Sequence, residues 1–191
     1  MPKPTSFPYR LESDRLILRC YDPADAPVLF EAVQESLLSL SPWLPWAQSE
    51  PTLAFFEAFV RRSRGEYDLM TNFNLAIYSK ADGRYLGGTG LHRFDWETGR
   101  FEIGYWLRDS AVGHGYVSEA AWRLAEFAFE DLKAERVELR VDVDNVRSRR
   151  VAERLGFKLE GVLRAWARRG DELRDLAVYS MIRAEYASLP S

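Results

Sequence analysis

Residues 106–132 read WLRDSAVGHGYVSEAAWRLAEFAFEDL, and this stretch decides the fold. An apolar strand end runs into a loop that contains Gly113 and Gly115, and an amphipathic helix follows. Glycine lets successive backbone N–H groups turn toward one point, and a helix start adds unpaired N–H groups and the positive end of its dipole. The stretch therefore predicts an anion-binding loop, for which phosphate is the usual ligand. A plain glycine turn before a core helix is the alternative that this stretch leaves open.

Length and composition predict one domain. The chain has 191 residues, 47% of them hydrophobic, and no linker rich in proline, glycine or serine divides it. We expect a single domain over residues 1–191, with residues 1–8 as a flexible leader. No apolar run is long enough for a signal peptide or a membrane span, so we expect a cytoplasmic protein that does not bind membranes. The net charge of -3 argues against general nucleic-acid binding and suits amine-bearing partners.

The supply of cysteine and histidine excludes several chemistries. Cys20 is the single cysteine, so intramolecular disulfides and cysteine-rich metal sites are excluded. His92 and His114 are the only histidines, which disfavours a histidine-ligated metal, and a serine triad would need one of them in the right place. We predict no metal site.

The first half of the chain predicts strands around two helices. Residues 15–20 alternate as a strand, and Asp22 before Pro23 is typical of a helix start. A second helix follows Pro51, with Leu53, Phe56, Phe59 and Val60 along one stripe. We expect the two helices to form a substrate-side lid, and the alternative is that Trp43 and Trp46 between them only pack against the core. Residues 73–92 then predict a hairpin around Asp82-Gly83, and residues 100–107 a third antiparallel strand.

The second half predicts the parallel part of the sheet. A helix over about 117–131 separates the strand at 100–107 from an alternating strand at 135–144, so these two strands should be parallel. Asn145 and Gly156 bound a further helix, and a hairpin turning at Gly170-Asp171 ends the chain. The prediction is an α+β fold: a mixed, mostly antiparallel twisted sheet with one central parallel pair and flanking helices. The carboxyl ends of that pair and a helix start should share one crevice.

Three motifs with this spacing resemble the GNAT superfamily of acyl-CoA-dependent N-acetyltransferases, in its RimJ/RimL-like branch. They are EIGYWL at 102–107, GHGYVSEA at 113–120 and DNVRSRRVAERLGF at 144–157. The resemblance extends over nearly the whole chain. It implies the acyl-CoA N-acyltransferase fold and acetyl-CoA as co-substrate.

The resemblance also implies which residues bind acetyl-CoA. The family's pyrophosphate loop, Q/R-x-x-G-x-G/A, maps onto Val112, Gly113, His114, Gly115, Tyr116 and Val117. Val112 and Val117 depart from the pattern, but the loop binds through main-chain N–H groups, which valine retains. The pantetheine arm should pair with the backbone of Trp106, Leu107 and Arg108 like an added strand, and one amide there should stabilise the oxyanion.

Asn145 and Ser148 have two readings. As cap and third helical residue they have a sufficient structural explanation, since a capping asparagine contributes about 1 kcal/mol. The resemblance places them beside the pantetheine arm, with the serine protonating or hydrogen-bonding the departing thiolate. Glu119 matches the family motif as well, but pairing with Arg123 on the helix surface explains it structurally.

Glu102 is the candidate base. Strand alternation puts Glu102, Gly104 and Trp106 on one face, opposite Phe101, Ile103, Tyr105 and Leu107, and we expect Gly104 to leave space for a ligand. Three roles are open for this carboxylate. It could be a base that acts directly or through water, it could anchor the substrate, or it could be an ordinary residue of the sheet surface.

The acceptor is an amine. The resemblance implies the N-terminal α-amino group of a ribosomal or other protein, attacking directly in a ternary complex. With a pKa of about 7.7 to 8.0 such a group needs only a modest base. Small amines and aminoglycoside-like compounds are alternative acceptors, because the sequence does not show which amine the aromatic residues of the lid would select. These residues are Trp43, Trp46, Phe55 and Phe56. A non-catalytic acyl-CoA-binding module is the alternative to an enzyme. The resemblance also allows a homodimer. We exclude a nucleotide-binding oxidoreductase. Its glycine-rich motif would have to open a helix, whereas GGTGLH at 87–92 lies in a predicted hairpin strand.

Overall fold

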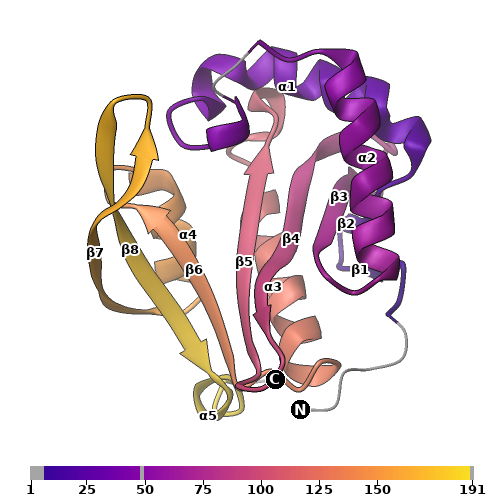
Figure 1. Cartoon of the computed structure of the whole chain (residues 1–191). Helices are drawn as coiled ribbons and strands as arrows, with labels where there is room; N and C mark the ends of the chain where they lie inside the picture. The colour runs from indigo at the N-terminus through magenta and orange to yellow at the C-terminus, as the bar shows by residue number, and fades with distance from the viewer. Residues whose placement is uncertain (1–6, 48–49, 190–191) are drawn as a thin grey trace.

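The computed structural model describes residues 7–47 and 50–189 and contains one eight-stranded sheet (Figure 1). Its strand order is β1-β2-β3-β4-β5-β6-β8-β7, and only the β5–β6 neighbours run parallel. The predicted mixed sheet with one parallel pair is confirmed. The short edge strand β1 was not predicted. The strands are β1 (Arg10–Glu12), β2 (Leu16–Cys20), β3 (Phe73–Ser79), β4 (Tyr85–Asp95), β5 (Arg100–Leu107), β6 (Arg136–Asp142), β7 (Lys158–Arg169) and β8 (Glu172–Ile182).

Of the two caps that the sequence predicts, Asn145 starts α4, whereas Asp22 starts a 3-10 turn that leads into α1 at Ala26. The Asp22 carboxylate accepts a hydrogen bond from the Ala24 N–H, and the Asn145 side chain accepts one from the Ser148 N–H at 3.1 Å. These contacts satisfy donors that a helix start leaves unpaired. The helices are α1 (Ala26–Leu40), α2 (Leu53–Asp68), α3 (Tyr116–Glu130), α4 (Val146–Arg154) and α5 (Arg183–Tyr186), with 3-10 turns η1 (Pro23–Asp25), η2 (Pro45–Ala47) and η3 (Asp109–Ala111).

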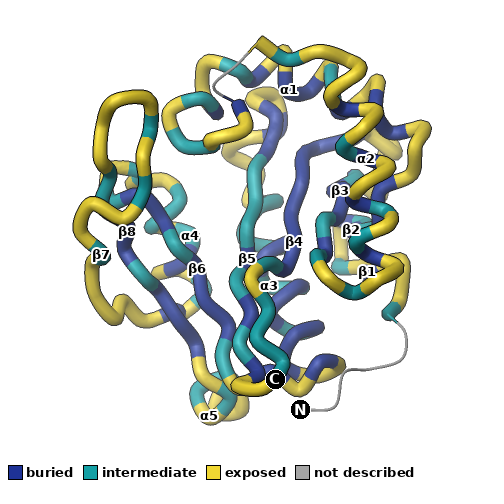
Figure 2. The backbone as a smooth tube through the Cα atoms, viewed as in Figure 1, coloured by how far each residue is buried: buried dark blue, intermediate teal, exposed yellow. Residues whose placement is uncertain are grey.

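Helices cover both faces of the sheet. Leu124 and Ala128 of α3 pack with Leu75 and Ile77 of β3 in the larger core. Ala76, between those two β3 residues, packs with α1 and α2 on the opposite face. This alternation follows from the two-residue period of a strand. The central strands are buried as a result, whereas the tip of the β7–β8 hairpin is exposed (Figure 2).

The predicted leader overlaps the described chain at two residues. Phe7 packs edge-on against Phe73, with ring centroids 4.3 Å apart, and the carbonyl oxygen of Pro8 accepts a hydrogen bond from the Tyr67 hydroxyl. Residues 7 and 8 are therefore part of the fold, and residues 1–6 lie outside the described chain.

The parallel pair is short, and this positions the site. β5 and β6 pair from Arg100–Arg136 to Glu102–Glu138 and then diverge (Figure 1). β5 nevertheless stays paired with β4 as far as Leu107. The C-terminal half of β5 therefore has an open edge on the side of β6.

Candidate active site

The glycine loop ahead of α3 lies at the open end of β5. Gly113 and Gly115 have φ angles of 93° and 79°, a region that side chains disfavour. Among the described residues, no atom accepts a hydrogen bond from the N–H groups of Gly113, His114 or Gly115. The Val112 N–H, in contrast, donates to the Asp109 carbonyl at 3.1 Å. The cradle of free amides thus begins at Gly113, one residue later than the sequence motif.

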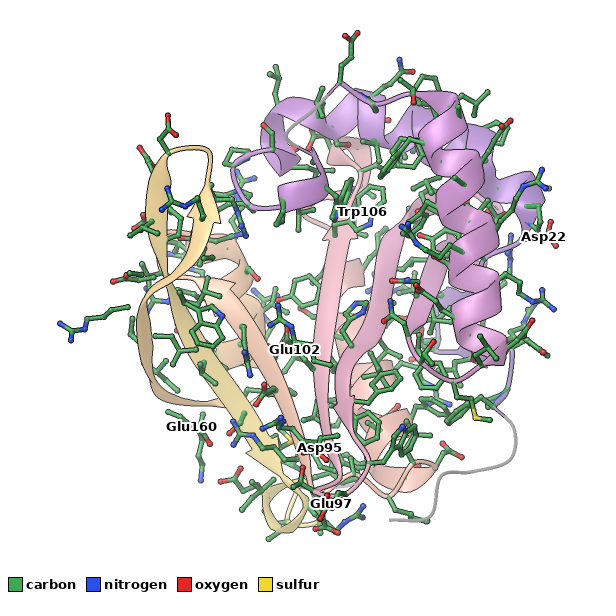
Figure 3. The ribbon with its side chains drawn as sticks, in the orientation of Figure 1. Asp22, Asp95, Glu97, Glu102, Trp106 and Glu160 are labelled. Carbon is green, nitrogen blue, oxygen red and sulfur yellow. The ribbon has the colours of Figure 1, made fainter. Side chains whose placement is uncertain are left out.

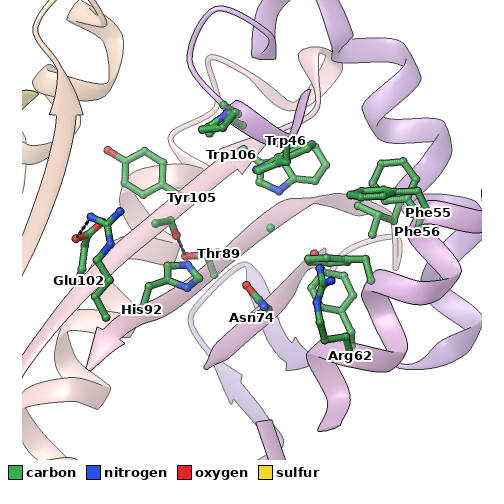
Figure 4. Close-up of a pocket in the computed structure, with 18 residues that line it drawn as sticks. Trp46, Phe55, Phe56, Arg62, Asn74, Thr89, His92, Glu102, Tyr105 and Trp106 are labelled. Carbon is green, nitrogen blue, oxygen red and sulfur yellow. Dashed lines mark hydrogen bonds and ion pairs between the residues drawn. The ribbon is translucent and has the colours of Figure 1, made fainter. Parts of the chain in front are cut away.

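Two cavities meet beside β5. One, of about 340 Å³, runs from the glycine loop to the start of α4. The other, of about 450 Å³, lies between β5 and the lid segments, and its wall includes Trp46, Phe55 and Phe56 (Figure 4). Leu44, Tyr105 and Trp106 line both cavities. The two cavities are therefore adjacent at Tyr105 and Trp106.

The first cavity gathers most of the residues that the sequence assigned to acetyl-CoA. Arg108 and His114 are not among the residues that line it, whereas Arg147 of α4 is. The predicted residues on its wall are Trp106, Leu107, Val112, Gly113, Gly115, Tyr116, Val117, Asn145 and Ser148.

Arg108 does not fit the role predicted for it. Its N–H already donates to the Leu86 carbonyl at 2.9 Å, so this amide is not free for a pantetheine arm. Its buried guanidinium donates to Glu35 and Glu31 of α1. Arg108 therefore fastens the lid helix to the end of β5.

Ser148 has a partner that strand alternation did not predict. Its hydroxyl lies 3.0 Å from the Tyr105 hydroxyl, and Tyr105 also donates to the Ser148 carbonyl oxygen. Burial raises the pKa of Tyr105 to about 12, so the phenol keeps its proton at neutral pH. Because β5 and β6 have diverged, Tyr105 lines both cavities. The two hydroxyls form a short chain that can carry a proton.

Glu102 lies on β5 (Figure 3) and lines the second cavity (Figure 4). Two arginines hold its carboxylate. Arg93 Nη1 lies 3.0 Å from Oε2, and Arg140 Nε lies 3.3 Å from the same oxygen. Burial raises the pKa of Glu102, and the two arginines offset part of that effect. A carboxylate offers about four acceptor positions, so Glu102 retains acceptor capacity for a ligand.

The space over Gly104 is shared with His92. A Cβ built on Gly104 would lie 3.0 Å from Cδ2 and Nε2 of His92, so the absence of a side chain makes room for this imidazole. Gly104 also lines the second cavity, and the expected ligand space over it stays a prediction. His92 itself lines the second cavity, and the sequence offered no pattern that assigned it a role.

Glu119 is structural, but with another partner than predicted. Its carboxylate accepts hydrogen bonds from the Ser13 hydroxyl and from the backbone and side chain of Arg15, not from Arg123. Arg15 also donates to the His114 carbonyl oxygen at 3.0 Å. This contact holds the glycine loop against the start of β2.

In residues 7–47 and 50–189, no group of three or more His, Cys, Asp or Glu side chains is arranged to hold a metal ion. Within the same part of the chain, every helix is too short or too polar to cross a membrane.

Comparisons with known proteins agree with this geometry. The acetyltransferase (GNAT) domain family matches residues 15–158. The "Putative ribosomal N-acetyltransferase YdaF" of Bacillus subtilis is 29% identical over 175 residues, which cover 91% of this chain and 94% of that protein. The ribosomal-protein-serine acetyltransferase of Escherichia coli is 37% identical over 81 residues, 42% of this chain and 45% of that protein.

A solved structure shows the same fold. The RimL ribosomal L7/L12 α-N-protein acetyltransferase in complex with coenzyme A superposes with a TM-score of 0.83 at 23% identity, over 89% of this chain and 93% of that one. The splayed parallel strands, the glycine loop with free amides and the family match over most of the chain point the same way. The chain belongs to the GNAT family of acetyl-CoA-dependent N-acetyltransferases.

Proposed function

We propose that this enzyme acetylates the N-terminal α-amino group of a ribosomal or other protein, by direct attack on acetyl-CoA in a ternary complex. The meeting of two cavities at Tyr105 and Trp106 carries this proposal. One cavity starts at free backbone amides suited to a diphosphate, and the other is walled by aromatic side chains and contains a carboxylate. The thioester and the amine then meet without a covalent enzyme intermediate.

The acetyl-CoA side fits its ligand in charge and shape. The amides of residues 113–115 and the start of α3 supply hydrogen bonds and a positive potential for the pyrophosphate. The open edge of β5 at Trp106 and Leu107 offers backbone groups to the amide-bearing pantetheine arm. Asn145 and Ser148 lie beside that path, where the serine hydroxyl, backed by Tyr105, serves the departing thiolate.

On the amine side we assign Glu102 as the anchor rather than the base. Two arginines hold its oxygens in place, and the carboxylate keeps acceptor positions for an N–H hydrogen bond from the amine. An α-amino group, partly neutral at pH 7 to 8, needs positioning more than a strong base.

A competition assay tests the proposal. The enzyme is incubated with acetyl-CoA, protein N-terminal peptides, the same peptides with a blocked α-amine and an internal lysine, and a panel of polyamines and aminoglycosides. Mass spectrometry should find acetate on free α-amines and none on the blocked peptides. Acetylated polyamines or aminoglycosides alone would favour a small-amine enzyme. Acetyl-CoA binding without transfer to any amine would favour a binding module.

The homodimer stays a prediction. Val162, Trp166 and Leu173 of the terminal hairpin are about half exposed, which suits a contact between two copies of the chain. Light scattering of the purified chain decides it.

A further inference from the structure

His92, on β4, lines the second cavity, which we assign to the amine. It lies opposite Glu102 across the β4–β5 ladder, and its ring rests on two glycines that are themselves partners in that ladder. A Cβ on Gly90 would lie 3.0 Å from Cε1, and one on Gly104 would lie 3.0 Å from Nε2. The absence of a Cβ on Gly90 and on Gly104 thus leaves the space that the imidazole occupies.

A break in β4 lets His92 face the cavity together with its neighbour. Arg93 has a φ of 48°, and the ladder to β5 is irregular between His92 and Asp95. Successive residues of a regular strand point to opposite faces, but both His92 and Arg93 line this cavity. A left-handed arginine is strained, and such strain is typical of functional sites.

The hydrogen bonds around His92 fix its tautomer. Nδ1 lies 2.7 Å from Oδ1 of Asn72, and Nδ2 of Asn72 donates to Glu66 at 3.1 Å. The bond to Glu66 identifies the Asn72 atom facing the ring as the carbonyl oxygen, which only accepts. Nδ1 therefore carries the hydrogen, and Nε2 presents a lone pair.

Nε2 is left without a partner. No described residue forms a hydrogen bond with Nε2. The atom is also not fully buried, so it is accessible from the cavity that His92 lines. Burial, with a smaller effect of the Arg93 charge, lowers the pKa of His92 to about 4. The ring is thus neutral, and Nε2 free to accept a proton, throughout the pH range in which an α-amine is neutral.

We propose that Nε2 of His92 accepts the proton of the attacking amine. This role rests on the proposed function and adds to it a base whose accepting nitrogen is free, whereas Arg93 and Arg140 hold the Glu102 carboxylate. His92 and Glu102, opposite each other on the same cavity wall, then divide the work, with the carboxylate orienting the nitrogen and the imidazole removing its proton. A clamped imidazole with one free nitrogen is the arrangement that general-base catalysis needs.

The step balances as follows. The amine nitrogen forms a bond to the thioester carbon, whose oxygen takes the negative charge, and the nitrogen becomes cationic and far more acidic than the free amine. Nε2 takes one proton from it, so a base of low pKa suffices. The carbon–sulfur bond then breaks, and the thiolate receives a proton from the Ser148–Tyr105 hydroxyls. His92 returns its proton to solvent, and the hydroxyl pair takes one back from solvent. The net result is the movement of one proton from nitrogen to sulfur.

Kinetics with added imidazole test this role. His92→Gln keeps a polar side chain of similar length but is no base, and kcat should fall about 10²- to 10⁴-fold. Its Kd for acetyl-CoA, measured by calorimetry, should stay within twofold because His92 lines only the other cavity. His92→Ala leaves the space over Gly90 and Gly104 empty, so imidazole in the buffer can occupy it. The rate of this variant should then rise in proportion to the imidazole concentration, and more strongly for imidazoles of higher pKa.

The second histidine supplies the matched control. His114→Ala, whatever its rate, should not respond to imidazole. A His92→Gln enzyme that turns over within threefold of wild type would overturn the proposal. So would a slow His92→Ala enzyme that keeps the wild-type near-ultraviolet spectrum and is not rescued, because the ring would then only fill space. A wild-type chain that acetylates no amine would instead overturn the proposed function, and the role of His92 with it.

Discussion

At the scale of single residues, the site separates a held carboxylate from a free imidazole. Glu102 shares its oxygens with Arg93 and Arg140, whereas Nε2 of His92 has no described partner. The two groups lie opposite each other on neighbouring strands. Their different surroundings give them different chemistry, although both face the same ligand.

Changing Glu102 to glutamine tests the anchoring role. The amide keeps the shape but loses the charge-assisted hydrogen bond to the amine, so KM for the amine should rise roughly tenfold while kcat changes by less than threefold. Steady-state kinetics against a protein N-terminal peptide measure both. A large fall in kcat at unchanged KM, deeper at low pH than at high pH, would return Glu102 to the role of base.

Ser148 allows its two roles to be separated. The cap of α4 uses the Ser148 N–H, and the hydroxyl bonds Tyr105 instead, so Ser148→Ala keeps the cap and removes only the hydroxyl. We expect kcat to fall roughly 10²-fold, with the Kd for acetyl-CoA unchanged. Asn145→Ala, which removes the cap acceptor, should lower the free energy of unfolding by about 1 kcal/mol. Wild-type turnover in Ser148→Ala would leave the serine a helix residue only.

At the scale of elements, the loop before α3 depends on backbone shape. Gly113 has a φ of 93°, and a Cβ there would meet nothing within 4 Å, so Gly113→Ala introduces strain without a clash. The left-handed region costs an ordinary residue about 1–2 kcal/mol. We expect the loop to relax, its amides to diverge and KM for acetyl-CoA to rise at least tenfold.

Gly170 is the matched control for this change. It has a φ of 55° in the β7–β8 turn and the same open surroundings. Gly170→Ala should lower the free energy of unfolding by a similar amount but leave KM for acetyl-CoA unchanged. Equal KM values for the two variants would show that the loop amides do not bind the cofactor.

At the scale of the whole molecule, one buried arginine joins the lid to the sheet. Hydrogen bonds from Arg108, aided by Ser110, lower the pKa of Glu35 on α1 to about 2. The folded pKa thus lies below the ordinary 4.5, so the carboxylate stabilises the fold fully above pH 4.5, and this contribution is lost as the pH falls toward 2. The attachment of the lid should therefore weaken in acid.

Glu35→Gln tests this linkage. The loss of unfolding free energy between pH 7 and pH 3, measured with denaturant, should be smaller in Glu35→Gln than in wild type. Glu31→Gln is the control, because Glu31 contacts the same arginine but its side chain is 68% exposed and screened by solvent. Parallel pH curves for wild type and Glu35→Gln would contradict the linkage.

The sequence by itself determined what depends on local pattern. Strand alternation, the caps Asp22 and Asn145 and the glycines at 113 and 115 each act within a few residues, so they predicted the element order, the parallel pair and the phosphate loop. Most residues assigned to acetyl-CoA line one cavity for the same reason, since the motif and its loop are contiguous.

Only the tertiary structure decided the contacts between distant elements. Arg108 meets Glu35 across 73 residues, Tyr105 meets Ser148 across 43, and His92 meets Asn72 across 20. The first contact gives the Arg108 side chain a partner on α1, and the other two involve the Tyr105 hydroxyl and the His92 imidazole, to which the sequence assigned no role. Where strands diverge and where a strand breaks its alternation are set by the packing of the whole sheet, and a local pattern carries no record of it.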